Sequence, residues 1–388
     1  MAVYNFDQIN ERRSVYSEKW NVEAGELPMW IADMDFETAP EVLEALHKRV
    51  DNGTFGYTYV PEEWYDAYVS WWRRRYDFSI EREWLLFCPG VIAALSSIVR
   101  KLSTVGEKVV VLTPVYNIFF NSIINNGRFP IECQLKETEG VYDIDFAELE
   151  EKLSDPQVSL LIFCNPHNPV GRIWTREELA KVGELCARYH VIAISDEVHC
   201  DLTKPGKAYV PFASASRTCL EHSITLMAPS KSFNMAGLCS ACILVENPLL
   251  RHRVWRGINT DEVGEPNAFA VQAVVAAYTK GESWLEELRK YLWNNRCYAE
   301  DYIRENIPKL KAIIGEATYL LWVDCRGCGM DGDTLAEELR RLTGLYVNGG
   351  GCYHGDGRGF IRINLACPRS ILEDGMKRLK DGIGQLCR

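Results

Sequence analysis

Long hydrophobic runs are missing from the 388-residue sequence. No apolar stretch approaches the roughly 18 residues that a membrane-spanning helix needs. The first residues, MAVYNFDQINERRSVYSEKW, carry charges throughout and lack the apolar core of a signal peptide. We therefore expect neither a membrane protein nor a secreted one, and we interpret the chain as cytoplasmic.

Basic residues are too few to balance the acidic ones. The sequence has 43 Lys and Arg residues against 54 Asp and Glu residues, a net charge of −11. A net negative surface repels the phosphate backbone of nucleic acids, so nucleic acid is not expected as a main partner. The imbalance still permits a local basic pocket for a small anion.

Cysteine is too sparse for a disulfide scaffold, because 14 residues among 388 fall well below the roughly 8–10% typical of such chains. Two Cys-x-x-Cys pairs, Cys239/Cys242 and Cys325/Cys328, lie far apart in the sequence. In zinc ribbons the second pair follows about 15–20 residues after the first. HExxH, P-loop and GxGxxG motifs are absent as well. We expect no metal site, and most cysteines to be small core residues of a reduced protein.

What the sequence does contain is an alternation of short apolar runs with helical patterns. Thr175–Tyr189 is predicted to be a helix that opens with a Thr175/Glu178 capping box. Near-continuous apolar strands separated by helices predict a mostly parallel sheet covered on both faces. The expected strands are Val109–Leu112, Leu160–Cys164, Val191–Ser195, Thr225–Ala228 and Ser240–Val245.

The last third of the chain has the pattern of a separate α/β lobe. A long helical pattern after Gly281 is expected to link the two lobes. The expected helices are Trp284–Glu305, Thr334–Leu342 and Ile371–Leu386, and the expected strands are Tyr319–Val323 and Phe360–Leu365.

Lys231 is the most informative candidate for chemistry. It is the only charged side chain between Ser223 and Val245. A lysine in an apolar stretch is either a functional amine with a lowered pKa or a turn residue whose ammonium lies in water. Ser230 and Ser232 add hydroxyls beside it, as an anion site requires.

Other candidates stand where strands end or helices begin. Asp196 follows the apolar run VIAIS, a place where an acid either pairs with a cationic ring nitrogen or caps a turn. Gly90 precedes a helical pattern whose first amides suit phosphate. Asn168 lies in an Asn/Pro loop that is either functional or only rigid. Arg362 has apolar neighbours, as a carboxylate clamp or an edge-strand charge would. Tyr57 lies in a Gly/aromatic/Pro loop and is otherwise a packed aromatic.

These signals occur in one order, which resembles that of the fold type I, aminotransferase-like enzymes that use pyridoxal 5′-phosphate (PLP). The resemblance covers nearly the whole chain and is closest to the MalY/PatB-type cystathionine β-lyases, or C–S lyases. The segments that carry it are LPMWIADMDF (27–36), FGYT (55–58), NPVG (168–171), SDEVH (195–199), APSKSFN (228–234) and RIN (362–364).

The resemblance implies a role for each residue around the cofactor ring. Lys231 is expected to form the Schiff base, and Asp196 to pair with the pyridine nitrogen, which makes the ring an electron sink. His199 and Asn168 are expected near the 3-hydroxyl group. Tyr116 is expected to stack on the ring.

The resemblance also implies which residues bind the phosphate and the substrate. Backbone amides of Val91 and Ile92 and the Ser230 hydroxyl are expected on the phosphate. Tyr57 would reach that phosphate from a neighbouring subunit, which implies a homodimer with shared sites and makes Tyr57, with Lys231 and Asp196, an expected catalytic residue. The substrate α-carboxylate is expected to bind Arg362, Asn168 and the backbone at Ala32.

Two positions depart from the wider fold type. Ala228 stands where many relatives have a phosphate-binding hydroxyl, and Cys239 stands where many aminotransferases have a phosphate-binding arginine. The phosphate cup is therefore less basic than in an aminotransferase, which favours the lyase branch.

The resemblance implies a large PLP-binding domain at 49–281, with a mostly parallel seven-stranded sheet between helices, and a smaller α/β domain made of 1–48 and 282–388. The implied activity is α,β-elimination of L-cystathionine or a related cysteine S-conjugate to a thiol, pyruvate and ammonia. The same residues also serve an aminotransferase. A regulatory binding protein with the same fold is the third possible function.

Overall fold

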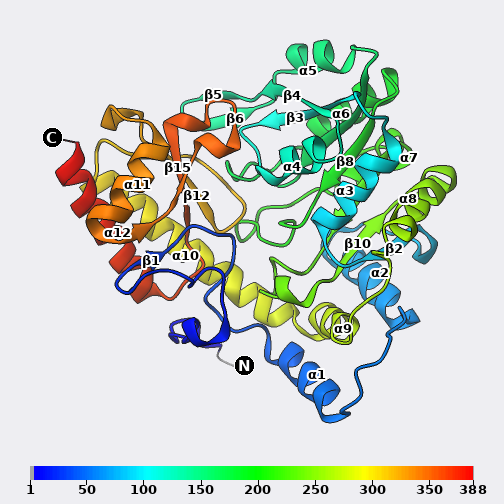
Figure 1. Ribbon diagram of the computed structural model, residues 1–388, viewed down its shortest axis with the longest axis horizontal. Helices are drawn as coiled ribbons and strands as arrows, with labels where there is room; N and C mark the ends of the chain where they lie inside the picture. The colour runs from blue at the N-terminus through cyan, green and yellow to red at the C-terminus, as the bar shows by residue number, and fades with distance from the viewer. Residues whose placement is uncertain (1–3, 388) are drawn as a thin grey trace.

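The computed structural model describes residues 4–387 of the chain. Its largest element is a seven-stranded sheet with the strand order β2-β10-β9-β8-β7-β3-β4 (Figure 1). Neighbouring strands from β4 to β9 run parallel, and β10 runs antiparallel to both of its neighbours. This confirms the expected mostly parallel sheet. Its strands are β2 (Leu85–Cys88), β3 (Lys108–Thr113), β4 (Phe129–Gln134), β7 (Val158–Cys164), β8 (Ile192–Asp196), β9 (Ser223–Met227) and β10 (Ala241–Leu244).

Helices cover this sheet on both faces because its strands are apolar on both sides. Side chains along a strand point alternately to opposite faces. In β3, Val109 and Val111 therefore pack into one core with α3, α4 and α8, while Val110 and Leu112 pack into another with α5 and α6. These helices are α3 (Val91–Leu102), α4 (Ile118–Ile124), α5 (Phe146–Leu153), α6 (Arg176–Arg188) and α8 (Pro248–Thr260).

The predicted helix start at Thr175 is confirmed. The Thr175 hydroxyl accepts a hydrogen bond from the backbone N–H of Glu178 at 3.2 Å, and the Glu178 carboxylate accepts one from the backbone N–H of Thr175 at 2.6 Å. This reciprocal capping box satisfies two N–H groups that have no partner inside the helix.

A second, smaller α/β domain is built from both ends of the chain, as expected. Its four-stranded sheet has the order β11-β12-β15-β14. The N-terminal strand β1 joins this part of the molecule by pairing with β13 in parallel. Its elements are β1 (Leu27–Pro28), β11 (Lys311–Ala312), β12 (Leu320–Asp324), β13 (Leu345–Tyr346), β14 (Asn348–Gly349), β15 (Phe360–Asn364), α11 (Gly332–Thr343) and α12 (Arg369–Leu386).

Helix α10 (Glu282–Asn306) links the two parts (Figure 1). Leu285 and Leu288 near its start are buried in the core formed with α2 and α9, and Ala299 and Ile303 near its end are buried in the core of the small domain. The division of the chain at 48/49 and 281/282 stays a prediction. The remaining elements are α1 (Pro40–Asp51), α2 (Glu62–Tyr76), α7 (Arg217–Glu221), α9 (Ala270–Lys280), β5 (Lys136–Thr138) and β6 (Val141–Asp143).

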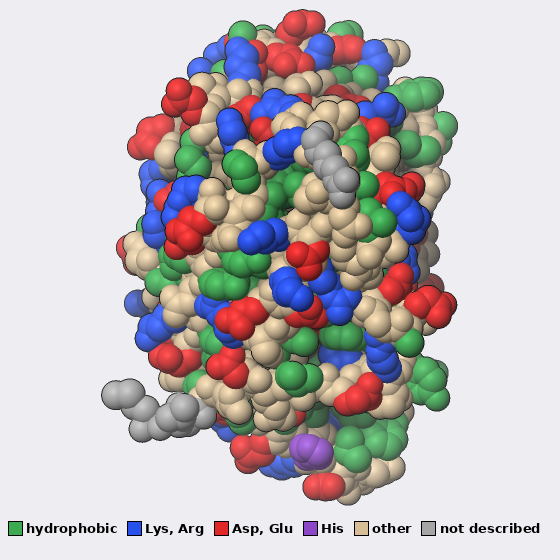
Figure 2. All heavy atoms as spheres, turned by 90° about the vertical axis from the view of Figure 1, so that its left-hand side faces the viewer, with side chains coloured by type: hydrophobic (Ala, Val, Ile, Leu, Met, Phe, Trp, Pro, Cys, Tyr) green, Lys and Arg blue, Asp and Glu red, His purple; other side chains and the backbone are tan. Residues whose placement is uncertain are grey.

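The surface seen from the side of α11 and α12 carries both signs of charge. Lys and Arg side chains are interspersed there with Asp and Glu side chains instead of gathering in a basic patch (Figure 2). Within residues 4–387, no helix combines the length and apolar character needed to cross a bilayer.

Candidate active site

Lys231 lies in the segment between β9 and β10, and its side chain reaches toward the N-terminal segment instead of open water. Its ammonium donates a hydrogen bond to the carbonyl oxygen of Ala32 at 2.6 Å. The surrounding protein disfavours the charged form, and this desolvation lowers the pKa of Lys231 to about 8. The structure therefore has an amine whose proton is held much less tightly than that of a surface lysine.

Asp196 is the last residue of β8, and its side chain is buried. Its carboxylate accepts a hydrogen bond from the backbone N–H of Val198 at 3.1 Å. Burial raises the pKa of Asp196 to about 6, and the hydrogen bond from Val198 and the positive charge of Lys231 offset this only in part. A cationic group placed beside this carboxylate would restore its charge.

His199 lies in the turn after β8 and is also buried. Within residues 4–387, its ring nitrogen Nδ1 has no hydrogen-bond partner. Burial, together with the positive charges of Lys231 and Arg362, lowers the pKa of His199 to about 3. A neutral imidazole with an unused nitrogen at a cavity wall is available to a bound ligand.

Helix α3 supplies the expected phosphate end. It begins at Val91 after Gly90, so the amides of Val91 and Ile92 belong to its first turn and have no partners inside the helix. Gly90 has an extended backbone that any residue adopts. Ser230 lies at the same cavity, together with Ser240, whose buried hydroxyl has no partner among residues 4–387. Free amides and hydroxyls at a helix N-terminus bind anions.

These groups share one cavity of about 240 Å³. Of the nine residues expected to bind the cofactor, all except Tyr57 line it: Val91, Ile92, Tyr116, Asn168, Asp196, His199, Ser230 and Lys231. Residues that are up to 140 positions apart in the sequence thus meet at the carboxyl ends of the strands, where open α/β sheets bind their ligands.

Arg362 lies on β15 of the small domain and is buried. One terminal nitrogen donates to the side-chain oxygen of Asn168 at 3.2 Å, and the other donates to the carbonyl oxygen of Trp30 at 3.0 Å. The guanidinium lies over the ring of Tyr353 at 5.0 Å from its centroid. Its Nε has no partner among residues 4–387. A buried guanidinium with an unused donor suits a bidentate carboxylate.

Arg362 lines an outer cavity of about 630 Å³. This outer cavity shares Ala32, Tyr116 and Lys231 with the inner one, so the two are continuous. The inner cavity has the donors for a phosphate and a ring, and the outer one has the clamp for a carboxylate.

Tyr57 is the expected residue that the structure does not bring to the site. It lies between α1 and α2, is fully exposed and lines neither cavity. Its expected role depends on a second copy of the chain, and it stays a prediction.

A family model described as aminotransferase class I and II matches residues 27–379. The chain belongs to this family. The matched range contains every residue that lines the inner cavity and those that line the outer one from Trp30 to Arg362.

Relatives of this aminotransferase-family chain match it over nearly its full length. The cystathionine beta-lyase PatB of Bacillus subtilis is 41% identical over 383 residues, which are 97% of this chain and 99% of that protein. The protein MalY of Escherichia coli is 33% identical over 389 residues, 98% of this chain and 99% of that protein. The structure of a PLP-bound C–S lyase from Staphylococcus hominis has a TM-score of 0.93 and 35% identity, and the match covers 98% of both chains.

Enzymes of this aminotransferase family depend on PLP, and the inner cavity fits that group. The first turn of α3 and the serine hydroxyls suit its phosphate, and the buried Asp196 suits its protonated ring nitrogen. Lys231 has an amine of lowered pKa for its aldehyde. The unpartnered Nδ1 of His199 and the amide of Asn168 are left for its hydroxyl group.

The structure also shows where Ala228 and Cys239 lie, the two positions that depart from the wider fold type. Ala228 lines the inner cavity and contributes no hydroxyl there, whereas Cys239 is exposed and lines neither cavity. The donors at this end of the inner cavity are consequently the α3 amides and the serine hydroxyls.

Sequence reasoning missed several residues of the outer cavity. Trp30 and Asp33 belong to the WIADMDF motif, which the sequence analysis used only to find the family. Arg12 lines the same cavity and pairs with Asp33. Asn348 and Tyr353 come from a glycine-rich stretch with neither helical nor strand periodicity, so no pattern marked them.

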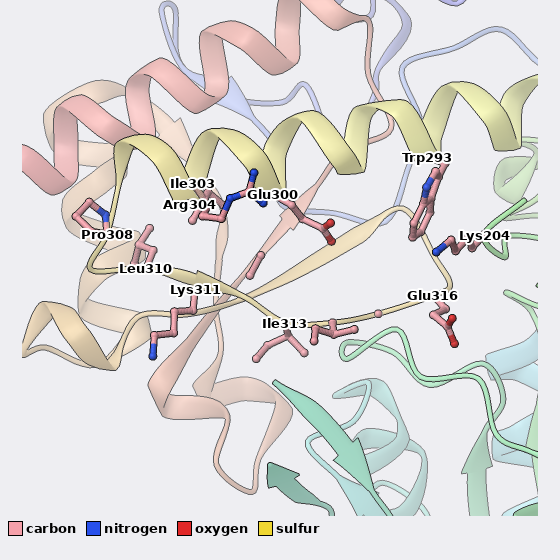
Figure 3. A pocket seen from close by; sticks show the side chains of 13 residues that line it. Lys204, Trp293, Glu300, Ile303, Arg304, Pro308, Leu310, Lys311, Ile313 and Glu316 are labelled. Atoms are coloured by element: carbon pink, nitrogen blue, oxygen red, sulfur yellow. The ribbon is translucent and has the colours of Figure 1, made fainter. Parts of the chain in front are cut away.

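A further cavity of about 570 Å³ lies between α10 and the segment from Pro308 to Glu316 (Figure 3). Trp293 and Lys204 stand at one end of it, with the Lys204 ammonium 4.9 Å from the centre of the Trp293 ring. None of the expected site residues lines this cavity. The candidate active site is therefore the pair of cavities around Lys231.

Proposed function

We propose that this chain is a PLP-dependent carbon–sulfur β-lyase that acts on L-cystathionine or a related cysteine S-conjugate. The substrate and water give a thiol, pyruvate and ammonia. The observation that carries the proposal is the meeting of Lys231, Asp196, Asn168 and Arg362 around two continuous cavities, in a chain so similar to a cystathionine β-lyase.

When bound, PLP supplies an electron sink for the charge that develops at Cα of the substrate. Asp196 supports this sink, because its carboxylate stabilises a protonated ring nitrogen. Asn168 is proposed to bind the cofactor hydroxyl, and its hydrogen bond to Arg362 supports a second contact with the substrate end of the site.

Lys231 is the proposed base that removes the Cα proton. With a pKa of about 8, about one in ten free Lys231 side chains is neutral at pH 7, whereas an ordinary lysine is neutral about once in three thousand. The proton taken from Cα is then available to the departing sulfur. A thiol of the cysteine type has a pKa of about 8.5, close to that of Lys231, so the return of the proton is nearly balanced.

Arg362 and the Ala32 backbone are proposed to hold the α-carboxylate. This fixes the substrate between the β15 side of the site and Lys231, with the sulfur substituent in the outer cavity. Its wall includes the aromatic rings of Trp30, Tyr116 and Tyr353, which accept an apolar chain.

The active form is proposed to be a homodimer. Phe55, Tyr57 and Tyr59 are exposed aromatic side chains in one loop, and a second copy of the chain would cover them. In this proposal Tyr57 enters the phosphate site of the partner. We further propose a cytoplasmic location, and a division into a large domain at 49–281 and a small one at 1–48 and 282–388.

The proposal is tested by incubating the purified protein with PLP and L-cystathionine in the absence of any keto acid. Pyruvate and a free thiol should form in equal amounts over many turnovers, and Lys231→Ala should form neither. A single conversion of the cofactor to its amine form without pyruvate would instead identify an aminotransferase.

A further inference from the structure

An acidic residue that the proposed mechanism does not use lines the same cavity as Lys231. Asp33 follows Ala32, whose carbonyl oxygen accepts the hydrogen bond from Lys231. Asp33 lines the outer cavity together with Lys231 and Arg362. Its carboxylate is paired with Arg12, with Oδ2 at 2.6 Å from Nη2. An Arg–Asp pair therefore stands at the wall of the site, beside the proposed base.

This pair is held firmly in place. Arg12 also binds the carboxylate of Asp35 at 2.9 Å, and Asp35 in turn binds the buried ammonium of Lys19 at 2.7 Å. The backbone of Asp33 is tied as well, because its carbonyl oxygen accepts hydrogen bonds from Lys19 at 3.0 Å and from Asn364 at 2.7 Å. With its backbone and one oxygen fixed, Asp33 keeps its charge at the cavity wall.

The other charged groups at the two cavities either have a role in the proposed mechanism or have little effect on Lys231. Besides Lys231 and two tyrosines, the charged and titratable groups at the two cavities are Asp33, Arg12 and Glu18 of the N-terminal segment, Asp196 and His199 at β8, Arg362 on β15, and the thiols of Cys164 and Cys352. Burial raises the pKa of each thiol, so both stay uncharged. In the proposed mechanism Asp196 serves the cofactor ring and Arg362 the substrate carboxylate. Glu18 is exposed, so water screens its charge. Tyr116 and Tyr353 stay neutral, because burial raises the pKa of each above its usual value.

We propose that Asp33 is a positioning residue for the charge of Lys231: it stabilises the ammonium formed when Lys231 takes a proton from the substrate, and Arg12 limits this effect. The inference rests on the proposed role of Lys231 as the base. It assigns the N-terminal segment a part in the chemistry beyond carboxylate binding.

The physical reason is a balance of opposed effects. Desolvation lowers the pKa of Lys231, and the negative charge of Asp33 is the largest influence that raises it, ahead of Asp196. Without Asp33 the ammonium would be less stable and would hold the proton too briefly to deliver it to sulfur. With an unpaired Asp33 the amine would stay protonated and would be a poor base. The pair with Arg12 keeps Lys231 between these extremes.

The test measures the pKa of Lys231 in the cofactor-free protein, so it does not depend on turnover. The rate of acetylation of Lys231 by acetic anhydride is followed against pH by peptide mass spectrometry. We expect a midpoint near pH 8 in the unmodified protein. Asp33→Asn should lower it by about one pH unit, because an opposite charge near the amine is lost. Arg12→Gln should raise it, because Asp33 is then unpaired.

A matched control comes from another acid–arginine pair of the same N-terminal segment. Glu26 binds Arg340 at 2.6 Å and lines neither cavity. Glu26→Gln should leave the midpoint of Lys231 unchanged. Arg12→Lys keeps the charge and should also leave the midpoint near its original pH. If Arg12→Gln does not fold, the comparison of Asp33→Asn with Asp33→Glu decides the question.

Shifts of opposite sign for Asp33→Asn and Arg12→Gln support the inference. Shifts of the same sign, or none beyond that of Glu26→Gln, overturn it. In the PLP-loaded enzyme the pH dependence of kcat should move in the same directions. If the opposite shifts occur but no variant or parent protein forms pyruvate, the proposed lyase function fails while the relation between Asp33 and Lys231 holds.

Discussion

Replacing Arg362 with glutamine is the sharpest single perturbation of the substrate end. Arg362 is buried, and its Nε has no partner among residues 4–387, so the guanidinium is prepared to receive a carboxylate. Glutamine has a shorter, uncharged side chain that offers one amide in place of the guanidinium fork. The change removes the proposed carboxylate clamp and leaves Lys231 and Asp196 in place.

The size of the effect follows from the number of bonds lost. Two hydrogen bonds between a guanidinium and a carboxylate contribute about 1.5–3 kcal/mol each. Their loss should cost about 3–6 kcal/mol of transition-state stabilisation, which corresponds to a reduction of about 10²- to 10⁴-fold in kcat/KM. Arg362→Lys keeps the charge but not the paired geometry, so its kcat/KM should lie between that of the parent enzyme and that of Arg362→Gln.

The assay is kcat/KM for methanethiol release, the product common to both substrates, from S-methyl-L-cysteine and from its carboxamide. The parent enzyme should strongly prefer the carboxylate, and Arg362→Gln should accept both nearly equally. Thermal unfolding of the variant checks its stability, because Arg362 also donates to Asn168 and to the Trp30 carbonyl. If kcat/KM for the carboxylate changed less than threefold, Arg362 would not be the clamp.

Three further predictions follow from buried groups and from the exposed loop. Asp196→Ala should retain some PLP but lower kcat by at least about 10²-fold, measured by pyruvate release, because the ring nitrogen loses its buried partner; an unchanged kcat would exclude that role. Burial holds the pKa of His167 at about 4 against about 6.5 in the unfolded chain. The unfolded chain therefore binds the extra proton between these values, and His167 by itself should contribute a loss of about 3 kcal/mol to the unfolding free energy of the cofactor-free protein as the pH falls from 7 to 4. His167→Gln should lack this loss in urea titrations, and identical pH curves would refute the assignment. Tyr57→Phe should weaken PLP binding, and mixing it with Lys231→Ala should form heterodimers that have one site with both native residues; recovery of no activity above that of either variant alone would contradict a shared site.

Local patterns predicted much of the fold because their causes are local. The continuous apolar run Val109–Leu112 marks a strand covered on both faces, and the Thr175/Glu178 pair marks a helix start, so both features could be found from a few consecutive residues. The same holds for Asp196, which lies at the end of an apolar run.

The arrangement of the site needed more than local patterns. Eight of nine expected cofactor residues line the inner cavity. Lys231, Asp196 and Asn168 were candidates from local patterns alone, whereas Tyr116 and His199 were found only through the resemblance to a family, since no spacing rule joins them to Lys231. The bond from Arg362 to Asn168 joins residues 194 positions apart. The pair of Arg12 with Asp33 depends on how the N-terminal segment folds back on itself, which charge counting along the sequence does not reveal.

The sharing of α10 between two cores has a consequence for motion during turnover. Residues at one end of this single helix are packed with the large-sheet part of the molecule, and residues at the other end are packed under the small sheet that bears Arg362. In the proposed mechanism the substrate is bound through its carboxylate to Arg362 of the small lobe, and its Cα proton is removed by Lys231 of the large lobe. The substrate therefore connects the two lobes. Any tilt of the lobes would turn the Cα–H bond relative to the lysine, so the stiffness of α10 sets how narrow the range of productive orientations is.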